Sequence, residues 1–158
     1  LSALEIVNLR IPNLKERLEI YSVGDDYFAK SKISQIINYK DLGIVNRATL
    51  LSIYSNVDAL VVSSREDSGP LMINECVASG VFVISTPVGV ANDLIISDKV
   101  GIVATAINQK AIADALLKFL KTYDSKNSSF EKQNCKNLTF EGYSLALIDL
   151  VRSVSVTK

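Results

Sequence analysis

The chain of 158 residues contains no histidine and no tryptophan, and it has only two cysteines and three prolines. Without histidine, Ser-His-Asp and Cys-His nucleophilic sites are excluded. Zinc sites with histidine ligands are excluded too, and two cysteines cannot form a four-thiolate site. Any acid, base or charge-stabilising group must therefore come from Asp, Glu, Lys, Tyr or the backbone.

The sequence also lacks an excess of charge of either sign and any long apolar run. Lys plus Arg and Asp plus Glu number 17 each, which argues against a nucleic-acid module and a polybasic membrane segment. The apolar runs are far shorter than the roughly 20 residues that span a bilayer, and the start has no signal-peptide pattern. Cys76 and Cys135 read as free thiols in a reducing cytosol, with one disulfide as the alternative. We expect a cytoplasmic chain without a transmembrane segment.

What is present suits one globular domain over residues 1–158, because 48% of the residues are hydrophobic and 22% are charged. Apolar runs of strand length lie at 18–23, 35–39, 58–63, 81–84 and 101–104. Helical patterns cover the first ten residues, 46–54, 71–79, 108–121 and 141–154. This alternation predicts an α/β fold, a doubly wound Rossmann-like parallel sheet with helices on both faces. Since such a domain usually opens with a strand, we expect that its first strand is lacking.

The densest polar signal lies at residues 63–75, where a strand ends, an acidic loop follows and a helix begins. Ligands bind at the carboxyl ends of strands in open α/β sheets. A helix N-terminus there suits phosphate, and Gly69 lets a ligand approach the backbone closely. The carboxylates of Asp67 and Glu75 can flank one site and accept hydrogen bonds from sugar or ribose hydroxyls.

Each of these residues also has a purely structural interpretation. Glu66 and Asp67 can be solvated loop acids that favour the helix N-terminus. Glu75 can be a paired surface residue, and the Ser68-Gly69-Pro70 segment can simply start a helix. Taken singly, none of them is specific.

Taken together, the motifs resemble a known family. Tyr54-Ser55-Asn56-Val57-Asp58 leads into a strand, and seven residues separate Asp67 from Glu75, as in an E-x7-E motif with Asp in first place. The segments 78–86 and 88–95 follow, like "A-C-G-x-P-V-I-A-T" and "G-G-x-x-E-L-I", with Val88 in place of one Gly. Their order and spacing resemble the C-terminal lobe of retaining GT-B glycosyltransferases of the family 4 group. Segments 18–26, 42–45 and 139–143 extend the resemblance over nearly the whole chain.

The resemblance implies a lobe that binds a nucleotide-diphosphate sugar, with UDP or GDP as the nucleotide. Asp67 and Glu75 become the candidate catalytic residues, the first beside the sugar hydroxyls and the second on the ribose hydroxyls. The other donor-binding candidates are Glu66, which could share the role of Asp67, the backbone of Ser68, Gly69, Leu71 and Met72, and, near the base, Val45 and Arg47. The resemblance also implies hexosyl transfer with retention to a glycan or lipid-linked acceptor in polysaccharide biosynthesis, without metal or cofactor.

Two departures from the family pattern qualify this expectation. The family carries an Arg and a Lys just upstream of the matching region, whereas Arg10 and Lys15 fall too late. The N-terminal lobe that binds the acceptor is also absent, and any peripheral membrane contact would come through it. We therefore expect a fragment of a two-lobed enzyme that has little or no transferase activity alone.

Two other functions remain open at this stage. A sugar-nucleotide epimerase lobe would share the fold and the donor, and would change the sugar without an acceptor. A non-catalytic interaction module would keep the fold and bind no nucleotide.

Overall fold

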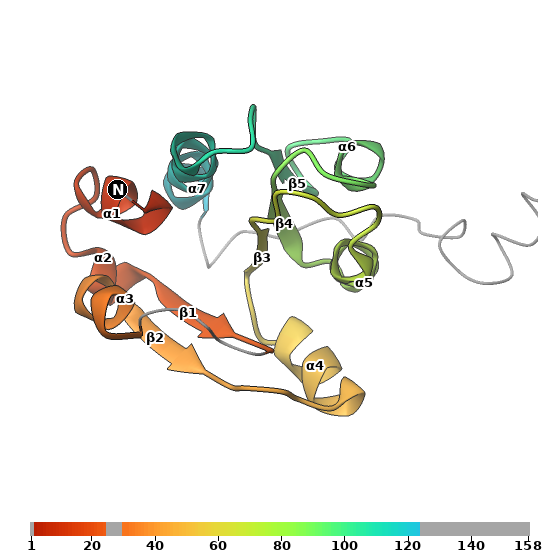
Figure 1. Cartoon of the computed structure of the whole chain (residues 1–158), viewed down its shortest axis with the longest axis horizontal. Helices are drawn as coiled ribbons and strands as arrows, with labels where there is room; N and C mark the ends of the chain where they lie inside the picture. Colours follow the sequence, from red (N-terminus) through yellow and green to blue (C-terminus); the bar gives the residue numbers. More distant parts are fainter. Residues whose placement is uncertain (1, 25–29, 124–158) are drawn as a thin grey trace, which may run out of the picture.

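The computed structural model describes residues 2–24 and 30–123, and its elements alternate between helix and strand (Figure 1). The strands are β1 (Glu19–Ser22), β2 (Asn38–Asp41), β3 (Ala59–Val62), β4 (Phe82–Ser85) and β5 (Gly101–Val103). The helices are α1 (Ala3–Asn8), α2 (Leu14–Arg17), α3 (Lys30–Ile36), α4 (Arg47–Tyr54), α5 (Leu71–Ser79), α6 (Ala91–Leu94) and α7 (Gln109–Thr122).

All strand pairs in the described residues are parallel. β1 pairs with β2, with Ile20 opposite Tyr39, and β4 lies between β3 and β5 in a second sheet. Each pair is joined by a segment that contains a helix, as parallel pairing requires. The parallel sheets with flanking helices confirm the predicted α/β fold class.

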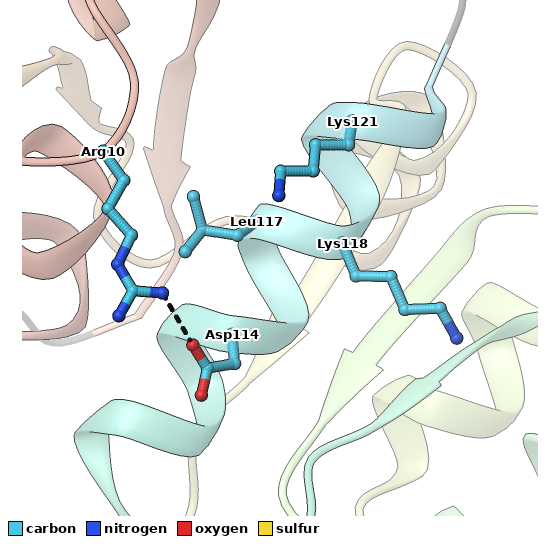
Figure 2. Close-up of a pocket in the computed structure, with 5 residues that line it drawn as sticks. All are labelled: Arg10, Asp114, Leu117, Lys118 and Lys121. Atoms are coloured by element: carbon cyan, nitrogen blue, oxygen red, sulfur yellow. Dashed lines mark hydrogen bonds and ion pairs between the residues drawn. The ribbon is translucent and has the colours of Figure 1, made fainter.

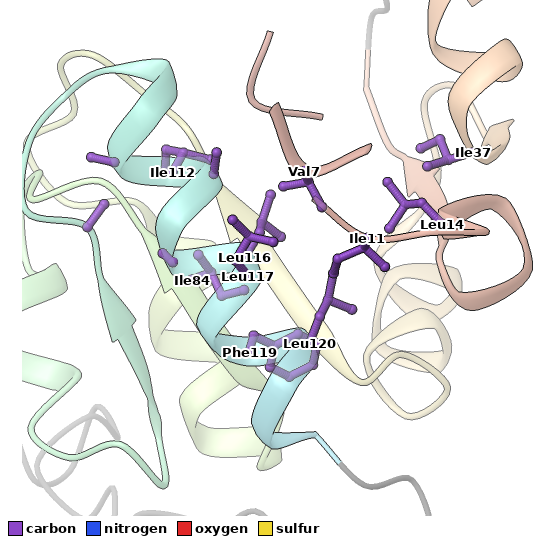
Figure 3. Packing of buried hydrophobic residues seen from close by; sticks show 14 of the residues in the cluster. Val7, Ile11, Leu14, Ile37, Ile84, Ile112, Leu116, Leu117, Phe119 and Leu120 are labelled. Atoms are coloured by element: carbon purple, nitrogen blue, oxygen red, sulfur yellow. The ribbon is translucent and has the colours of Figure 1, made fainter. Parts of the chain in front are cut away.

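One face of the sheets is covered by α1, α3 and α7, which share a hydrophobic cluster (Figure 3). The long helix α7 supplies most of its buried side chains, because its apolar residues recur with helical spacing. Its Phe119 ring lies 5.1 Å from the Phe82 ring of β4, measured between centroids. Arg10, just after α1, pairs with Asp114 of α7 at 3.2 Å. This face therefore joins the start of the chain to its last described helix.

The opposite face packs against α4, α5 and α6 through a second cluster. Ile73, Cys76 and Val77 of α5 are buried there against Val62 of β3 and Val83 of β4. Phe82 and Ile84 of β4 belong to the first cluster and Val83 between them to the second, and all four residues of the strand are buried. The prediction of helices on both faces is thus confirmed.

One predicted strand is wrong in its bounds. Residues 35–39 read as a strand, yet α3 runs to Ile36 and β2 begins only at Asn38. Ile33 and Ile36 both pack on the first cluster, and Ile37 is buried in it. A short apolar run suits a helix end or a strand equally, and tertiary packing decides between them.

The remaining expectations about the chain have mixed outcomes. The predicted helix 141–154 and Cys135 lie outside the described residues, and Cys76 is buried with a free thiol. In the part of the chain that the structure describes, no helix is long and apolar enough to cross a membrane.

Candidate functional site

The acidic loop after β3 is exposed and runs directly into α5. Glu66, Asp67, Ser68 and Gly69 are all exposed. The Asp67 carboxylate accepts a hydrogen bond from the Gly69 N–H at 3.0 Å, which holds the loop in a tight turn. Pro70 is the N-cap of α5 and makes no side-chain capping bond. The helix therefore begins without a side-chain acceptor from its own cap, and the first helical residues Leu71 and Met72 are exposed beside the loop.

A second loop, between β4 and α6, packs against the acidic loop. Gly89 has a φ of 49°, and a Cβ there would lie 2.9 Å from Asp67 O, Gly69 N and the Pro70 Cδ. Such a contact is too short for any side chain, so only glycine allows this approach. Thr86 is buried, and its hydroxyl donates to the Ser64 carbonyl at 2.7 Å. These two residues fix the shape of the loop that carries Asp67.

Glu75 lies about one turn into α5 and is held by α4. The Tyr54 hydroxyl donates to Glu75 Oε2 at 3.1 Å, and Arg47 Nη1 lies 3.5 Å from Oε1. The Glu75 side chain is only 16% exposed, whereas that of Arg47 is 75% exposed. Tyr54 therefore fixes the carboxylate from the buried side, and Arg47 faces it from the solvent side.

The surroundings of Glu75 keep the neighbouring Tyr54 hydroxyl and Cys76 thiol in their neutral, protonated forms. Burial, then the nearby Cys76 and the hydrogen bond to Glu75, raise the pKa of the Tyr54 hydroxyl. Burial and the negative charge of Glu75 raise the pKa of the Cys76 thiol to about 12. Tyr54 consequently remains a hydrogen-bond donor throughout the neutral range, and Cys76 is an unreactive core residue.

These raised pKa values predict a loss of stability in alkali. Above the ordinary pKa of 9.0 for the Cys76 thiol, the unfolded chain ionises while the folded chain does not, until about pH 12. The free energy of unfolding should fall there by up to about 1.4 kcal/mol per pH unit for this group. Urea unfolding at several pH values would measure it. Cys76→Ala should show a shallower fall, and an equal slope in both proteins would contradict the assignment.

The structure groups the predicted site residues in two places. Asp67, Ser68 and Gly69 share the loop with Glu66, and Leu71 and Met72 follow at the start of α5. Arg47, which is expected near the base, pairs with Glu75. Val45 lies half-buried in the segment between β2 and α4.

Sequence reasoning assigned no role to three residues that shape this region. Tyr54, Thr86 and Gly89 all lie in motif segments, but nothing local shows that Tyr54 reaches Glu75 or that Gly89 touches the acidic loop. Their contacts are long-range ones, across 21 residues for Tyr54 and Glu75.

Two surface depressions among the described residues lie away from this loop. One of about 330 Å³ lies beside α7, where Arg10 reaches Asp114 and Leu117, Lys118 and Lys121 complete the lining (Figure 2). A second, of about 290 Å³, lies around the segment between α6 and β5. Neither includes a residue of the loop 63–70 or of α5. Within residues 2–24 and 30–123, no group of three or more Cys, Asp or Glu side chains could hold a metal ion.

An exposed loop follows a strand of the parallel sheet and leads into a helix, and a fixed carboxylate lies one turn into that helix. This arrangement is that of a Rossmann-like α/β lobe, a class that binds ligands at its strand ends. Comparison with known proteins makes the class specific. The model of the family "Glycosyl transferases group 1" matches residues 28–136. The chain therefore belongs to this family of glycosyltransferases.

Solved structures of GT-B glycosyltransferases share the fold. A sucrose-phosphate synthase from Thermosynechococcus elongatus is 18% identical with a TM-score of 0.61, over 99% of this chain and 42% of that one. Anabaena HepE, solved in complex with UDP and glucose, is 16% identical with a TM-score of 0.66, over 98% of this chain and 44% of that one. The chain thus spans less than half the length of either protein. A search of curated proteins gave no match.

Proposed function

We propose that residues 1–158 form the C-terminal donor-binding lobe of a retaining, family 4-like glycosyltransferase. The lobe would bind a nucleotide-diphosphate sugar, with UDP or GDP as the nucleotide. The observation that carries the proposal is the arrangement of α5, whose start is exposed and has no side-chain cap, while Glu75 one turn further in is fixed by Tyr54. A phosphate group and a diol fit these two features respectively.

Different residues of the acidic loop and of helix α5 would contact different parts of the donor. The backbone of Ser68, Gly69, Leu71 and Met72 would face the sugar and the pyrophosphate. Asp67, with Glu66 beside it, would accept hydrogen bonds from the sugar hydroxyls. Glu75 would accept them from the ribose hydroxyls. Arg47, already paired with Glu75 at 3.5 Å, and Val45 would lie on the base side.

The rest of the proposal concerns the whole enzyme. It would transfer a hexosyl group with retention to a glycan or lipid-linked acceptor in polysaccharide biosynthesis in the cytoplasm, without metal or cofactor. An N-terminal lobe would bind the acceptor and make any peripheral membrane contact. The coverage of 42% and 44% of the two solved structures and the family match support a lobe of a larger enzyme.

Titration of the purified chain with UDP, GDP and ADP tests the donor site. Binding to the native state raises the free energy of unfolding by about 2.7 kcal/mol at a hundred times the dissociation constant, so the melting temperature should rise by several degrees with the matching nucleotide. Sulfate at equal ionic strength serves as the control. If no nucleotide raises the melting temperature at millimolar concentration, the donor site is refuted and the non-catalytic interaction module takes its place. Sugar transfer by the isolated chain would refute the need for a second lobe.

A further inference from the structure

The depression of about 330 Å³ beside α7 has a lining that is rich in positive charge (Figure 2). Three cationic side chains, one carboxylate and one apolar side chain line it, namely Arg10, Lys118, Lys121, Asp114 and Leu117. The whole chain has equal numbers of positive and negative side chains. The excess of positive charge in this depression is therefore local, and it favours an anionic ligand.

One of the three cations, Lys118, is already paired with an acid from another segment. Its ammonium lies 2.9 Å from Asp98 Oδ1 and 3.0 Å from Oδ2, so both oxygens of that carboxylate hold it. Figure 2 shows Lys118 pointing to the side of α7 away from Arg10. Asp114 lies four residues before Lys118, a spacing that suits a helical ion pair, yet it pairs with Arg10 instead.

Arg10 uses a small part of its hydrogen-bonding capacity on Asp114. A guanidinium group has five N–H donors in a planar fork. Within the described residues, the Arg10 side chain makes one hydrogen bond, from Nη1 to Asp114 Oδ1 at 3.2 Å. The two side chains are 55% and 50% exposed, and a pair so exposed contributes little to stability. Arg10 therefore has donors free for a second acceptor, and its fork geometry suits two phosphate oxygens.

Lys121 is a cation without a counter-ion in the part of the chain that the structure describes, because the ion pairs there involve other side chains. It lies four residues after Leu117 and seven after Asp114, so these three residues share one stripe of α7. Seven residues of helix rise about 10 Å. The long side chains of Arg10 and Lys121 can thus reach one anion between them, beside Leu117.

A second arginine adds positive charge at the end of α7. Arg17, the last residue of α2, donates from Nη2 to the Leu120 carbonyl oxygen at 3.4 Å. This bond satisfies one of the carbonyl groups that a helix end leaves open. Since Arg17 fills that structural role, Lys121 beside it remains available to a ligand.

We propose that the depression between α1 and α7 binds a phosphate monoester group, held by Arg10 and Lys121 beside Leu117. The Arg10 fork binds two of the phosphate oxygens, and the Lys121 ammonium binds a third. The charge of Asp114 repels the phosphate and limits the affinity. The bound group links the start of the chain to α7. The depression includes no residue of the loop 63–70 or of α5, so the proposal does not depend on the proposed function.

Titration of the 158-residue chain with inorganic phosphate at neutral pH tests the site. Isothermal calorimetry measures the dissociation constant, and the backbone amide signals in NMR spectra locate the anion. Chloride at equal ionic strength is the control for screening. The exposed start of α5 also suits phosphate. We therefore expect saturable shift changes around Arg10, Leu117 and Lys121, whatever happens at residues 68–72.

Four substitutions locate the phosphate more sharply. Arg10→Gln and Lys121→Gln should each weaken its binding about tenfold, the loss expected for one charge-assisted hydrogen bond. Lys110→Gln removes the same charge from the same helix, but about 10 Å from Leu117 along the axis, and should change the affinity less than about twofold. Asp114→Asn should strengthen binding at least roughly threefold, because the repulsion is lost and Arg10 is released.

A second arm of the experiment distinguishes two sources of the phosphate group. Vesicles of phosphatidylcholine with phosphatidic acid present a phosphate monoester as a lipid headgroup, and vesicles of phosphatidylcholine alone do not. Cosedimentation that requires phosphatidic acid and is weakened by Lys121→Gln supports the site with a lipid as its ligand. Binding of inorganic phosphate without cosedimentation supports the site with a soluble phosphate compound as its ligand.

Three results would overturn the proposal. The first is that neither inorganic phosphate nor vesicles with phosphatidic acid bind. The second is unchanged affinity in both Arg10→Gln and Lys121→Gln, which would place the anion outside this depression. The third is an equal loss of affinity in Lys110→Gln, which would reduce the effect to the overall charge of α7.

Discussion

Glu75→Gln is expected to weaken nucleotide binding by about 10- to 100-fold while leaving the fold intact. A hydrogen bond to a charged group contributes about 1.5–3 kcal/mol, and glutamine removes the charge with almost no change of volume. The amide oxygen of the substituted side chain can still accept the Tyr54 hydroxyl, which now bonds to the carboxylate at 3.1 Å. The lost ion pair with Arg47 costs little stability because that side chain is 75% exposed. Isothermal titration with the nucleotide that stabilises the wild type measures the change.

Glu66→Gln is the matched control for this substitution. Glu66 also lies beside the start of α5 and is exposed. The proposal places it at the sugar hydroxyls, which a free nucleotide lacks, so its replacement should change the dissociation constant of the nucleotide by less than about threefold. The charge of Glu75 also raises the pKa of the Cys76 thiol. That pKa should therefore fall in Glu75→Gln, and thiol titration in alkali reports this independently of any ligand. Equal nucleotide affinity in Glu75→Gln and wild type would remove Glu75 from the site.

The elements that the sequence predicts well are those with one dominant local pattern. Helix α7 has both an N-cap and an amphipathic pattern. The Asn108 side chain accepts a hydrogen bond from the Ala111 N–H, and the apolar face of the helix is buried. Strand β4 is buried throughout, and all of its residues except Ser85 are apolar. Helix α5 ends at Gly80, whose φ is 77°, as a glycine after a helix predicts. In these places propensity, pattern and tertiary packing agree.

Prediction fails where a contact made elsewhere in the chain decides the outcome. The helix end at Ile36 is set by the cluster on which it packs, not by its own sequence. The environment of Glu75 depends on Tyr54, which lies on another helix. Helices α2 and α6 have four residues each, too few to show a period. The motif spacing located the loop of Asp67, but only the structure shows that Gly89 supports it.

Gly101→Ala is expected to have the largest effect on stability. Gly101 is buried and lies opposite Val83 in the β4–β5 register. A Cβ at this position would lie 2.2 Å from the Val83 carbonyl oxygen and 2.9 Å from Ile95 Cγ2. The nearest atom belongs to the backbone of the central strand, so relief requires β5 to move away from β4. Overpacking of a core usually costs about 1–3 kcal/mol, and this backbone clash should cost about 3 kcal/mol or more.

Gly69→Ala is the matched control, because a Cβ there would have no atom within 4 Å. Its free energy of unfolding should stay within about 0.5 kcal/mol of the wild type. Gly101→Ala should lower the melting temperature by roughly 6–12 °C at this chain length, and urea unfolding should show an earlier midpoint with an unchanged slope.

The two glycines thus separate two roles. Gly101 permits strand pairing, and its replacement should reduce stability with or without nucleotide. Gly69 leaves the backbone open to a ligand, so its replacement should reduce nucleotide affinity alone. If Gly69→Ala unfolds as readily as Gly101→Ala, the acidic loop is a structural support and not a binding surface.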